Sequence, residues 1–461
     1  MRSAQHLVLQ TTSGGVRTLV FCVGLIGCAL GQIDRASAQT FTAPTPTTVG
    51  SPAVPSLAAQ VSTVPSSGVL SLDQWILTPT VGVYALYDSN IHTSATDPMS
   101  GPAFHFHPAI LADYNSGIHD TQFYGNIDST IYPTLNSTNN TFNKQAGVIE
   151  KYSPLPDLLF TVHGDYTHNT NTYVLQNSLP APVTSPGTPP PPGAGGIIAA
   201  QQTVVDPNDT YTGTGTILKQ FSLGSVTVGG TLQTTQFSQN SSQSYNTSSY
   251  NGSGNYYITP AFYVFSDGIQ SFQSPETGPG SNYFRARAGV GSAQIGLFSG
   301  FVYYGQQGSE VNGDGNAGGD IYGGGINYFP TAVWTMNFSV DRLRNISNIT
   351  SGVPFALGGL PFVPVGVSAA TSLETTTLTF KTNYQISQQT SGHAVVSYSL
   401  GQQLSGTPIN DTTWFADVGI SHQLRQNLTM SFDYQYSSFV SPTPQTSFTR
   451  SLVTVGGNYT F

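Results

Sequence analysis

The sequence predicts an all-β protein: a transmembrane up-and-down antiparallel β-barrel of about 18 strands, preceded by a flexible N-terminal segment. Three observations predict this fold. Apolar and polar residues alternate over strand-length segments, short and long connections alternate along the chain, and the composition is poor in charge. Alternation with a period of two gives each strand one apolar face and one polar face.

The composition argues against a soluble protein. Only 8% of the 461 residues are charged, whereas ordinary soluble domains contain about 25%. The chain has 50 glycines, 25 phenylalanines and 24 tyrosines, which suit strands and turns better than helices. A soluble surface with so little charge would be poorly protected against association, and so many aromatic residues argue against general disorder.

The first 38 residues are predicted to be a signal peptide. Arg2 and Arg17 precede the apolar run LVFCVGLIGCALG at residues 19–31. This run is too short to cross a bilayer as a helix, but it has the length of a signal-peptide core. Ala36-Ser37-Ala38 supplies a cleavage site with small residues, so the mature chain is expected to begin at Gln39.

An alternative processing route would give a lipoprotein. Leu25-Ile26-Gly27-Cys28 resembles a lipoprotein cleavage box, and cleavage there would leave Cys28 lipidated. Cleavage after Ala38 would instead remove Cys22 and Cys28, the two cysteines of the sequence, and would leave 10 basic and 21 acidic residues of the original 13 and 22. This mild acidity argues against a nucleic-acid partner.

Residues 39–72 form a segment rich in Pro, Thr and Ser, predicted to be flexible and periplasmic. Residues 73–461 carry the barrel pattern. Within His119 to Pro133, Phe123 and Ile127 fall on one face and Tyr124 and Asp128 on the other. The same pattern returns in residues 158–167, 334–341, 414–421 and 428–436. The apolar faces are expected to contact outer-membrane lipid, because a closed barrel pairs all its backbone groups internally.

The connections are predicted to sort by length between the two ends of the barrel. Short ones lie at residues 116–117, 153–157, 221–225, 330–332, 387–390 and 422–427, with longer ones between them, including 171–208 and 343–371. The pattern gives 17 clear strands, but two periplasmic termini require an even number. A turn at Asp267-Gly268, followed by a short strand at residues 269–273, brings the count to 18; the alternative is 16.

The C-terminal residues carry an assembly signature. Thr454, Gly456, Tyr459 and Phe461 follow the pattern polar-x-Gly-x-x-aromatic-x-aromatic, which resembles the terminal signal of bacterial outer-membrane barrels. The resemblance implies residence in the outer membrane of a Gram-negative cell and docking on the barrel assembly machinery. Tyr459 and Phe461 are expected in the periplasmic aromatic girdle.

A second resemblance lies near the start of the predicted barrel. Residues 77–83 lead into Tyr87-Asp88-Ser89-Asn90-Ile91, and a Pro-x-hydrophobic-x-Ala pattern follows within residues 108–114. Over about 40 residues this resembles the β-barrel porins associated with exopolysaccharide loci. The resemblance implies a pore or an export accessory, and it brings no catalytic residue.

Charged residues on the polar faces are expected to line the lumen, where water or an opposite charge solvates them. Opposed acidic and basic walls would create a transverse field that filters polar solutes; the alternative is salt bridges that brace a wide barrel or a plug. Tyr124 and Phe415 are candidate platforms for stacking sugars. The predicted lumen-lining residues are Asp120, Asp128, Asp165, Arg285, Arg287, Asp341, Lys381, Asp417, Asp433 and Arg450.

The sequence supports no catalytic, metal or cofactor site. His105 and His107 share a strand face, but two ligands do not make a typical metal site, and two polar-face histidines are the favoured interpretation. His163 and Asp165 share the polar face of their strand and would suit acid–base work in a barrel hydrolase, whereas His168 falls on the other face or in a loop. No nucleophile elbow, phosphate loop or zinc motif accompanies them.

The resulting expectation is a porin-like pore for small hydrophilic solutes, or an accessory to polysaccharide export. The alternatives are a closed barrel that acts as a surface adhesin or assembly partner through its outer loops, residues 171–208 above all, and the barrel hydrolase. The solute, the oligomeric state and a plugged or open lumen are left open by the sequence.

Overall fold

The computed structural model describes residues 70–72, 75–91, 98–135, 140–170, 207–238, 244–277, 280–311, 315–347, 371–403, 410–442 and 447–461. The predicted signal peptide, Cys28 and residues 39–69 of the predicted flexible segment lie outside these ranges. Within the described ranges no helix is long and apolar enough to cross a membrane.

In the described residues, one antiparallel sheet of 19 strands makes up the fold. The strands in chain order are β1 (Leu70–Leu72), β2 (Trp75–Asp88), β3 (Gly101–Asn115), β4 (His119–Ile131), β5 (Thr141–Leu155), β6 (Leu158–Asn169), β7 (Asn208–Phe221), β8 (Gly224–Phe237), β9 (Tyr245–Thr259), β10 (Phe262–Pro275), β11 (Ser281–Ile295), β12 (Phe298–Val311), β13 (Gly315–Thr331), β14 (Trp334–Ser347), β15 (Thr371–Gln385), β16 (Thr390–Gln403), β17 (Asn410–Arg425), β18 (Leu428–Val440) and β19 (Phe448–Thr460).

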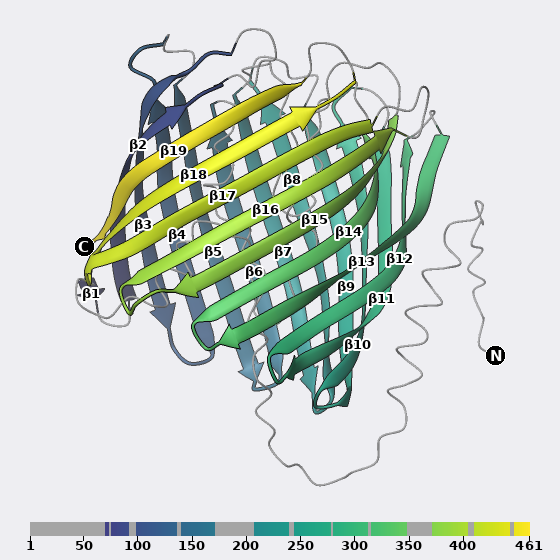
Figure 1. Cartoon of the computed structure of the whole chain (residues 1–461). Helices are drawn as coiled ribbons and strands as arrows, with labels where there is room; N and C mark the ends of the chain where they lie inside the picture. Colours follow the sequence, from purple (N-terminus) through teal and green to yellow (C-terminus); the bar gives the residue numbers. More distant parts are fainter. Residues whose placement is uncertain are drawn as a thin grey trace, which may run out of the picture. The chain divides into compact units, whose positions relative to one another are not determined.

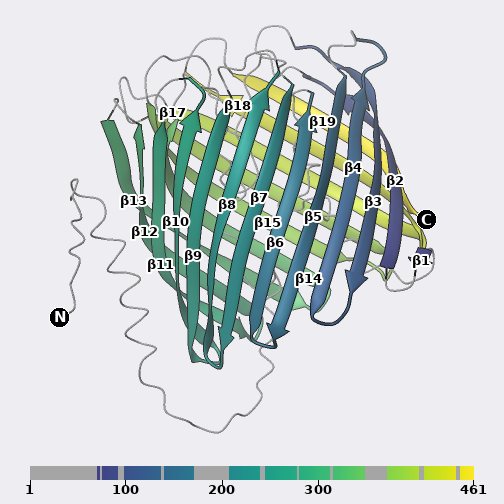
Figure 2. The same ribbon diagram turned by 180° about the vertical axis from the view of Figure 1, so that it is seen from behind.

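The sheet closes into a barrel of 18 strands. Each strand from β2 onward pairs with the next, and β19 pairs back with β2, from Leu452 opposite Asp88 to Thr460 opposite Thr80. Figure 1 shows β14 to β19 crossing the near wall, and Figure 2 shows β2 to β9 on the far side. Closure leaves no open edge on β2 to β19, so the predicted barrel and its 18 strands are confirmed.

The connections alternate in length as predicted. The connections after β3, β5, β7, β9, β11, β13, β15 and β17 are turns of two to four residues at the lower end of the barrel in Figure 1. At the other end the connections are longer, except the one between Val311 and Gly315. The chain ends at the lower end, where the Thr460 N–H donates to the Asn427 carbonyl over 2.9 Å. Gly117 and Gly296 adopt φ of 87° and 62° in two of the short turns, a left-handed conformation that glycine reaches at no steric cost.

Two local predictions were wrong. Asp267-Gly268 is not a turn but the middle of the continuous strand β10, and the turn lies at residues 260–261. Asp267 pairs with Ser253 and Arg287 on its two neighbours, and its carboxylate faces inward. Leu70–Leu72, assigned from sequence to the flexible segment, instead form β1 on the edge of β2, where backbone hydrogen bonds hold them.

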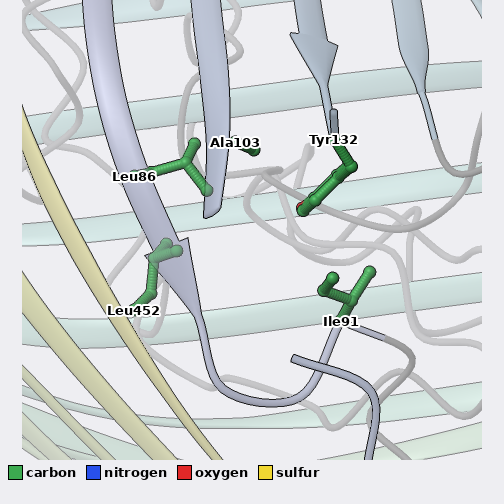
Figure 3. Close-up of a cluster of buried hydrophobic side chains, with 5 residues drawn as sticks. All are labelled: Leu86, Ile91, Ala103, Tyr132 and Leu452. Carbon is green, nitrogen blue, oxygen red and sulfur yellow. The ribbon is translucent and has the colours of Figure 1, made fainter. Parts of the chain in front are cut away.

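The two faces of the barrel differ as the alternation predicts. Outward side chains are apolar and exposed, for example Leu232 at 63% and Val162 at 59%, whereas inward Thr78 and Asp88 are at 1% and 0%. Lipid is the medium in which such an exterior is stable. The described residues hold one small buried apolar cluster, on the inner side between β2, β3 and β19 (Figure 3); its members are Leu86, Ile91, Ala103, Tyr132 and Leu452.

Candidate functional site

The inner face of the barrel carries the predicted lumen-lining residues. In β4, Asp120 and Asp128 alternate with the exposed Phe123 and Ile127, and the other predicted positions follow the same rule. The structure therefore places all ten on the face away from the exposed apolar residues, namely Asp120, Asp128, Asp165, Arg285, Arg287, Asp341, Lys381, Asp417, Asp433 and Arg450.

The outer face carries aromatic residues at the turn end of the strands. Trp75 packs against Tyr114 with ring centroids 5.1 Å apart, and Phe298 stacks on Tyr328 at 4.8 Å. Tyr459 and Phe461 meet edge to face at 4.9 Å. The three pairs lie at the turn end of the barrel, where an interfacial aromatic girdle is expected.

One half of the inner face, formed by β16 to β19 and β2 to β6, is the acidic wall. His105 Nε2 lies 2.7 Å from an Asp128 carboxylate oxygen, and the Lys151 ammonium lies 3.0 Å from Asp120. His393 Nε2 lies 3.3 Å from Asp417 and 3.7 Å from Asp433. The carboxylates of this wall among the described residues are Asp88, Asp113, Asp120, Asp128, Asp165, Asp411, Asp417 and Asp433.

His163 and Asp165, the pair considered for acid–base chemistry, are joined through Tyr124. The Tyr124 hydroxyl donates to Asp165 over 2.6 Å and lies 2.7 Å from His163 Nε2. Gln145 and Thr167 also donate to the Asp165 carboxylate, over 2.9 and 3.0 Å. A carboxylate held by three donors braces β4, β5 and β6. His168 points outward and contacts Asp209 at 2.8 Å.

The opposite half, β9 to β15, is the aromatic wall. Arg287 Nε donates to Asp267 over 2.5 Å, and Arg285 lies 3.6 Å from the same carboxylate. The Arg287 guanidinium also sits 4.8 Å above the Tyr303 ring, whose hydroxyl donates to Asp341 over 2.6 Å. Lys381 lies lower on this wall, opposite Asn337 of β14.

The salt bridges described above connect strands within a wall. Asp267 with Arg285 and Arg287 joins β10 to β11, and Lys151 with Asp120 joins β4 to β5. Such pairs brace the barrel, which was one of the two predicted roles. The walls nevertheless differ in charge, because the described acidic wall has only Lys151 and Arg450 as lysine or arginine against its carboxylates. The other predicted role, a transverse field, therefore remains compatible with the geometry.

A side-chain clasp joins the first and last strands of the barrel. Arg450 of β19 binds Asp88 at the end of β2 through Nε, at 3.0 Å to both carboxylate oxygens, and through Nη2 at 2.5 Å. Asn90 donates from its backbone to Asp88 and from its amide to the Thr449 carbonyl, each over 3.0 Å. The Ser89 backbone N–H donates to the Ser451 carbonyl, and the Ser451 backbone N–H donates to the Ser89 hydroxyl. The motif Asp88-Ser89-Asn90 thus closes the barrel.

Inner-face aromatic residues repeatedly oppose glycines. Tyr84 pairs directly with Gly456, and Tyr124 with Gly147. A Cβ on either glycine would collide with the opposing ring, so each ring lies flat over the bare backbone of its neighbour. Gly456 of the terminal signature is required here because the Tyr84 ring occupies the space of a side chain.

Sequence reasoning missed several inner charges. Asp88 and Lys151 follow the inward alternation of their strands, so that rule would have identified them. Asp267 was missed because it was assigned to a turn. His105 and His107 lie with ring centroids 6.2 Å apart, but no group of three or more His, Cys, Asp or Glu in the described ranges could hold a metal ion.

Comparison with known proteins finds similar barrels only among solved structures. No family model and no curated protein matches the chain. The outer membrane protein OpdK of Pseudomonas aeruginosa aligns with a TM-score of 0.46 and 10% identity, over 84% of this chain and 99% of that one. The siderophore receptor PirA of the same organism gives 0.43 and 8%, over 84% and 80%. OccAB4 of Acinetobacter baumannii gives 0.45 and 10%, over 84% and 98%.

Proposed function

We propose that the protein is an outer-membrane, porin-like pore for small hydrophilic solutes. One observation carries the proposal: a closed barrel of 18 strands has an apolar exterior and an inner face of hydroxyl, amide and charged groups. Polar inner faces are stable in a membrane protein where water fills the lumen. Barrels of 16–18 strands leave an aqueous channel unless a loop folds into them.

The charge of the inner face sets the expected selectivity. Carboxylates dominate the acidic wall, while Arg285 and Arg287 on the other wall are engaged by Asp267. Fixed negative charge along a water-filled passage raises the local concentration of cations. The pore is therefore expected to prefer cations to anions.

Conductance in planar bilayers tests the proposal. The purified barrel should give discrete steps, and its reversal potential in a KCl gradient should report cation preference. The double substitution Asp165→Asn and Asp433→Asn should move the reversal potential toward zero, because it removes inner-face charge. Asp320→Asn is the control. Asp320 is exposed on the outer face beside Tyr304, so its charge is not on the inner face.

Two results would count against the pore. A barrel that inserts but gives no steps has a blocked lumen, and equal reversal potentials in both variants would mean that these carboxylates do not face the conducting path. The adhesin alternative depends on residues 171–208, of which all but 207 and 208 lie outside the described residues. Deleting residues 171–206 should leave conductance steps intact if the barrel wall forms the pore.

Two finer expectations remain predictions. Docking of β19 on the barrel assembly machinery is supported by the outward position of Tyr459 and Phe461 at the end of the last strand. A role in polysaccharide export is supported by the resemblance of residues 77–114 to barrels associated with exopolysaccharide loci.

A further inference from the structure

A continuous row of aromatic rings lies on the inner face of β9, β10 and β12. We call it the aromatic row, and it consists of Tyr257, Tyr263, Phe265 and Phe301. Successive ring centroids are 5.6, 6.1 and 6.3 Å apart. All four side chains are partly exposed. The row begins beside the turn at residues 260–261 and ends below Asp267, the next inward residue of β10.

Glycines on the neighbouring strands form the floor of the aromatic row. Tyr263 and Phe265 stand directly opposite Gly291 and Gly289 of β11, and Phe301 stands opposite Gly325 of β13. A Cβ at any of these three glycines would collide with the ring opposite it. Each of these three rings therefore lies against bare backbone on one side and is partly exposed on the inner face. The planes of successive rings in the row are inclined by 55°, 45° and 74°.

Uncharged hydrogen-bonding groups flank the aromatic row on both sides. On one side, the Ser225 backbone N–H and hydroxyl donate to the Asn255 amide oxygen over 2.7 and 2.9 Å. On the other side, Asn337 donates to Asn327 over 2.8 Å, and Asn327 donates to the Ser299 hydroxyl over 3.0 Å. The surface thus combines aromatic rings with amides and hydroxyls at its edges.

We propose that the aromatic row is a binding track for saccharide rings, within the pore proposed above, on which it rests. The face of a sugar ring presents C–H groups, which the negative face of an aromatic ring attracts. The rim of a sugar ring presents hydroxyls, which both donate to and accept from amides and hydroxyls. Ring spacings of 5.6–6.3 Å let successive sugar units keep contact while they advance.

The charges nearby favour a neutral sugar over an anionic solute. Arg285 and Arg287, the cations above the row, already share the Asp267 carboxylate. Lys381 lies one strand beyond the flank of the row, opposite Asn337. An anion at the row would therefore compete with an existing ion pair, and it would also face an acidic wall across the lumen. A neutral saccharide meets neither obstacle.

Current block by maltotriose in planar bilayers tests this inference on the full barrel. Maltotriose should interrupt the ion current in a concentration-dependent way, and sorbitol, which has hydroxyls but no ring face, should not. Replacing Phe265 and Phe301 by Leu keeps apolar bulk but removes both ring faces, and should weaken block by maltotriose about tenfold, since each stacked pair contributes a fewfold in affinity. Phe272→Leu with Phe338→Leu is the matched control, because both residues are exposed on the outer face, at 45% and 48%.

Each outcome decides a different point. Open pores that maltotriose does not block, or equal block in the two double variants, overturn the saccharide track and leave the pore proposal standing. Block by phenol but not by maltotriose shows that the row takes aromatic solutes, and it also overturns the inference. Absence of conductance in the unmodified barrel overturns the proposed pore itself.

Discussion

The seam between β19 and β2 joins strands from the two ends of the barrel segment, whereas β10 and β11, on the far side of the barrel, are consecutive strands joined through residues 276–280. The seam ladder runs from Leu452 opposite Asp88 to Thr460 opposite Thr80. The β10–β11 ladder is longer, from Phe262 opposite Ser292 to Gln273 opposite Ser281. Beyond its short ladder, the seam is continued by side chains in the Asp88–Arg450 clasp.

Chain connectivity explains the difference. Asp88 and Arg450 are 362 residues apart, and the entropic cost of bringing two chain segments together grows with their separation. A hairpin is held together by its own turn. The seam has no turn, and it is held instead by a buried ion pair and by the apolar cluster around Leu86 and Leu452 (Figure 3).

The largest effect is expected at the clasp. Arg450→Ala would leave the Asp88 carboxylate, whose side chain is 0% exposed, without its guanidinium, and breaking a buried ion pair costs about 3–5 kcal/mol. Urea unfolding of the barrel in detergent micelles, followed by tryptophan fluorescence, measures the loss. The control Lys219→Ala breaks a pair with Asp157 in which the two side chains are 36% and 49% exposed, and should cost much less, because exposed ion pairs contribute little to stability. Equal losses would contradict a special role for the seam.

An intermediate effect is expected on the aromatic wall. Gly291→Ala would push a methyl group into the Tyr263 ring, and overpacking of this kind costs about 1–3 kcal/mol. The double variant with Tyr263→Ala should recover most of the loss in the same unfolding experiment, because the three atoms nearest to the added methyl group all belong to the Tyr263 side chain. Gly213→Ala serves as the control, because a Cβ there would meet open space. A similar loss of stability in this control would mean that the cost at Gly291 comes from the backbone and not from a collision with the Tyr263 ring.

The smallest effect is expected at an ion pair outside both regions. A hydrogen bond from Lys219 lowers the pKa of the Asp157 carboxyl in the β5–β6 turn. The folded state therefore favours the charged carboxylate, so this contribution is present at neutral pH and is lost as the pH falls through that lowered pKa. Asp157→Asn should shift the urea midpoint slightly at pH 7, and the shift should shrink as the pH falls through the lowered pKa. A difference in urea midpoint that grows as the pH falls would contradict this prediction.

Much of the candidate site followed from local sequence. Alternation placed Asp128, Arg287 and Asp433 on the inner face because the period of a strand is two everywhere. The same rule would have placed Asp88 and Lys151. It failed at Asp267-Gly268, where a dipeptide typical of hairpin turns lies inside a strand paired on both sides. Local turn propensity was overridden there by pairing with two neighbouring strands.

By itself, the sequence determined the closed barrel, its apolar exterior and its polar interior, because these depend on composition and on a pattern that each strand carries alone. Only the tertiary structure decided which residues stand opposite one another: Arg450 at Asp88, Tyr84 at Gly456, and Phe265 at Gly289. These partners are set by the register of neighbouring strands and by closure of the sheet. Register is a property of pairs of strands, so no strand read alone contains it.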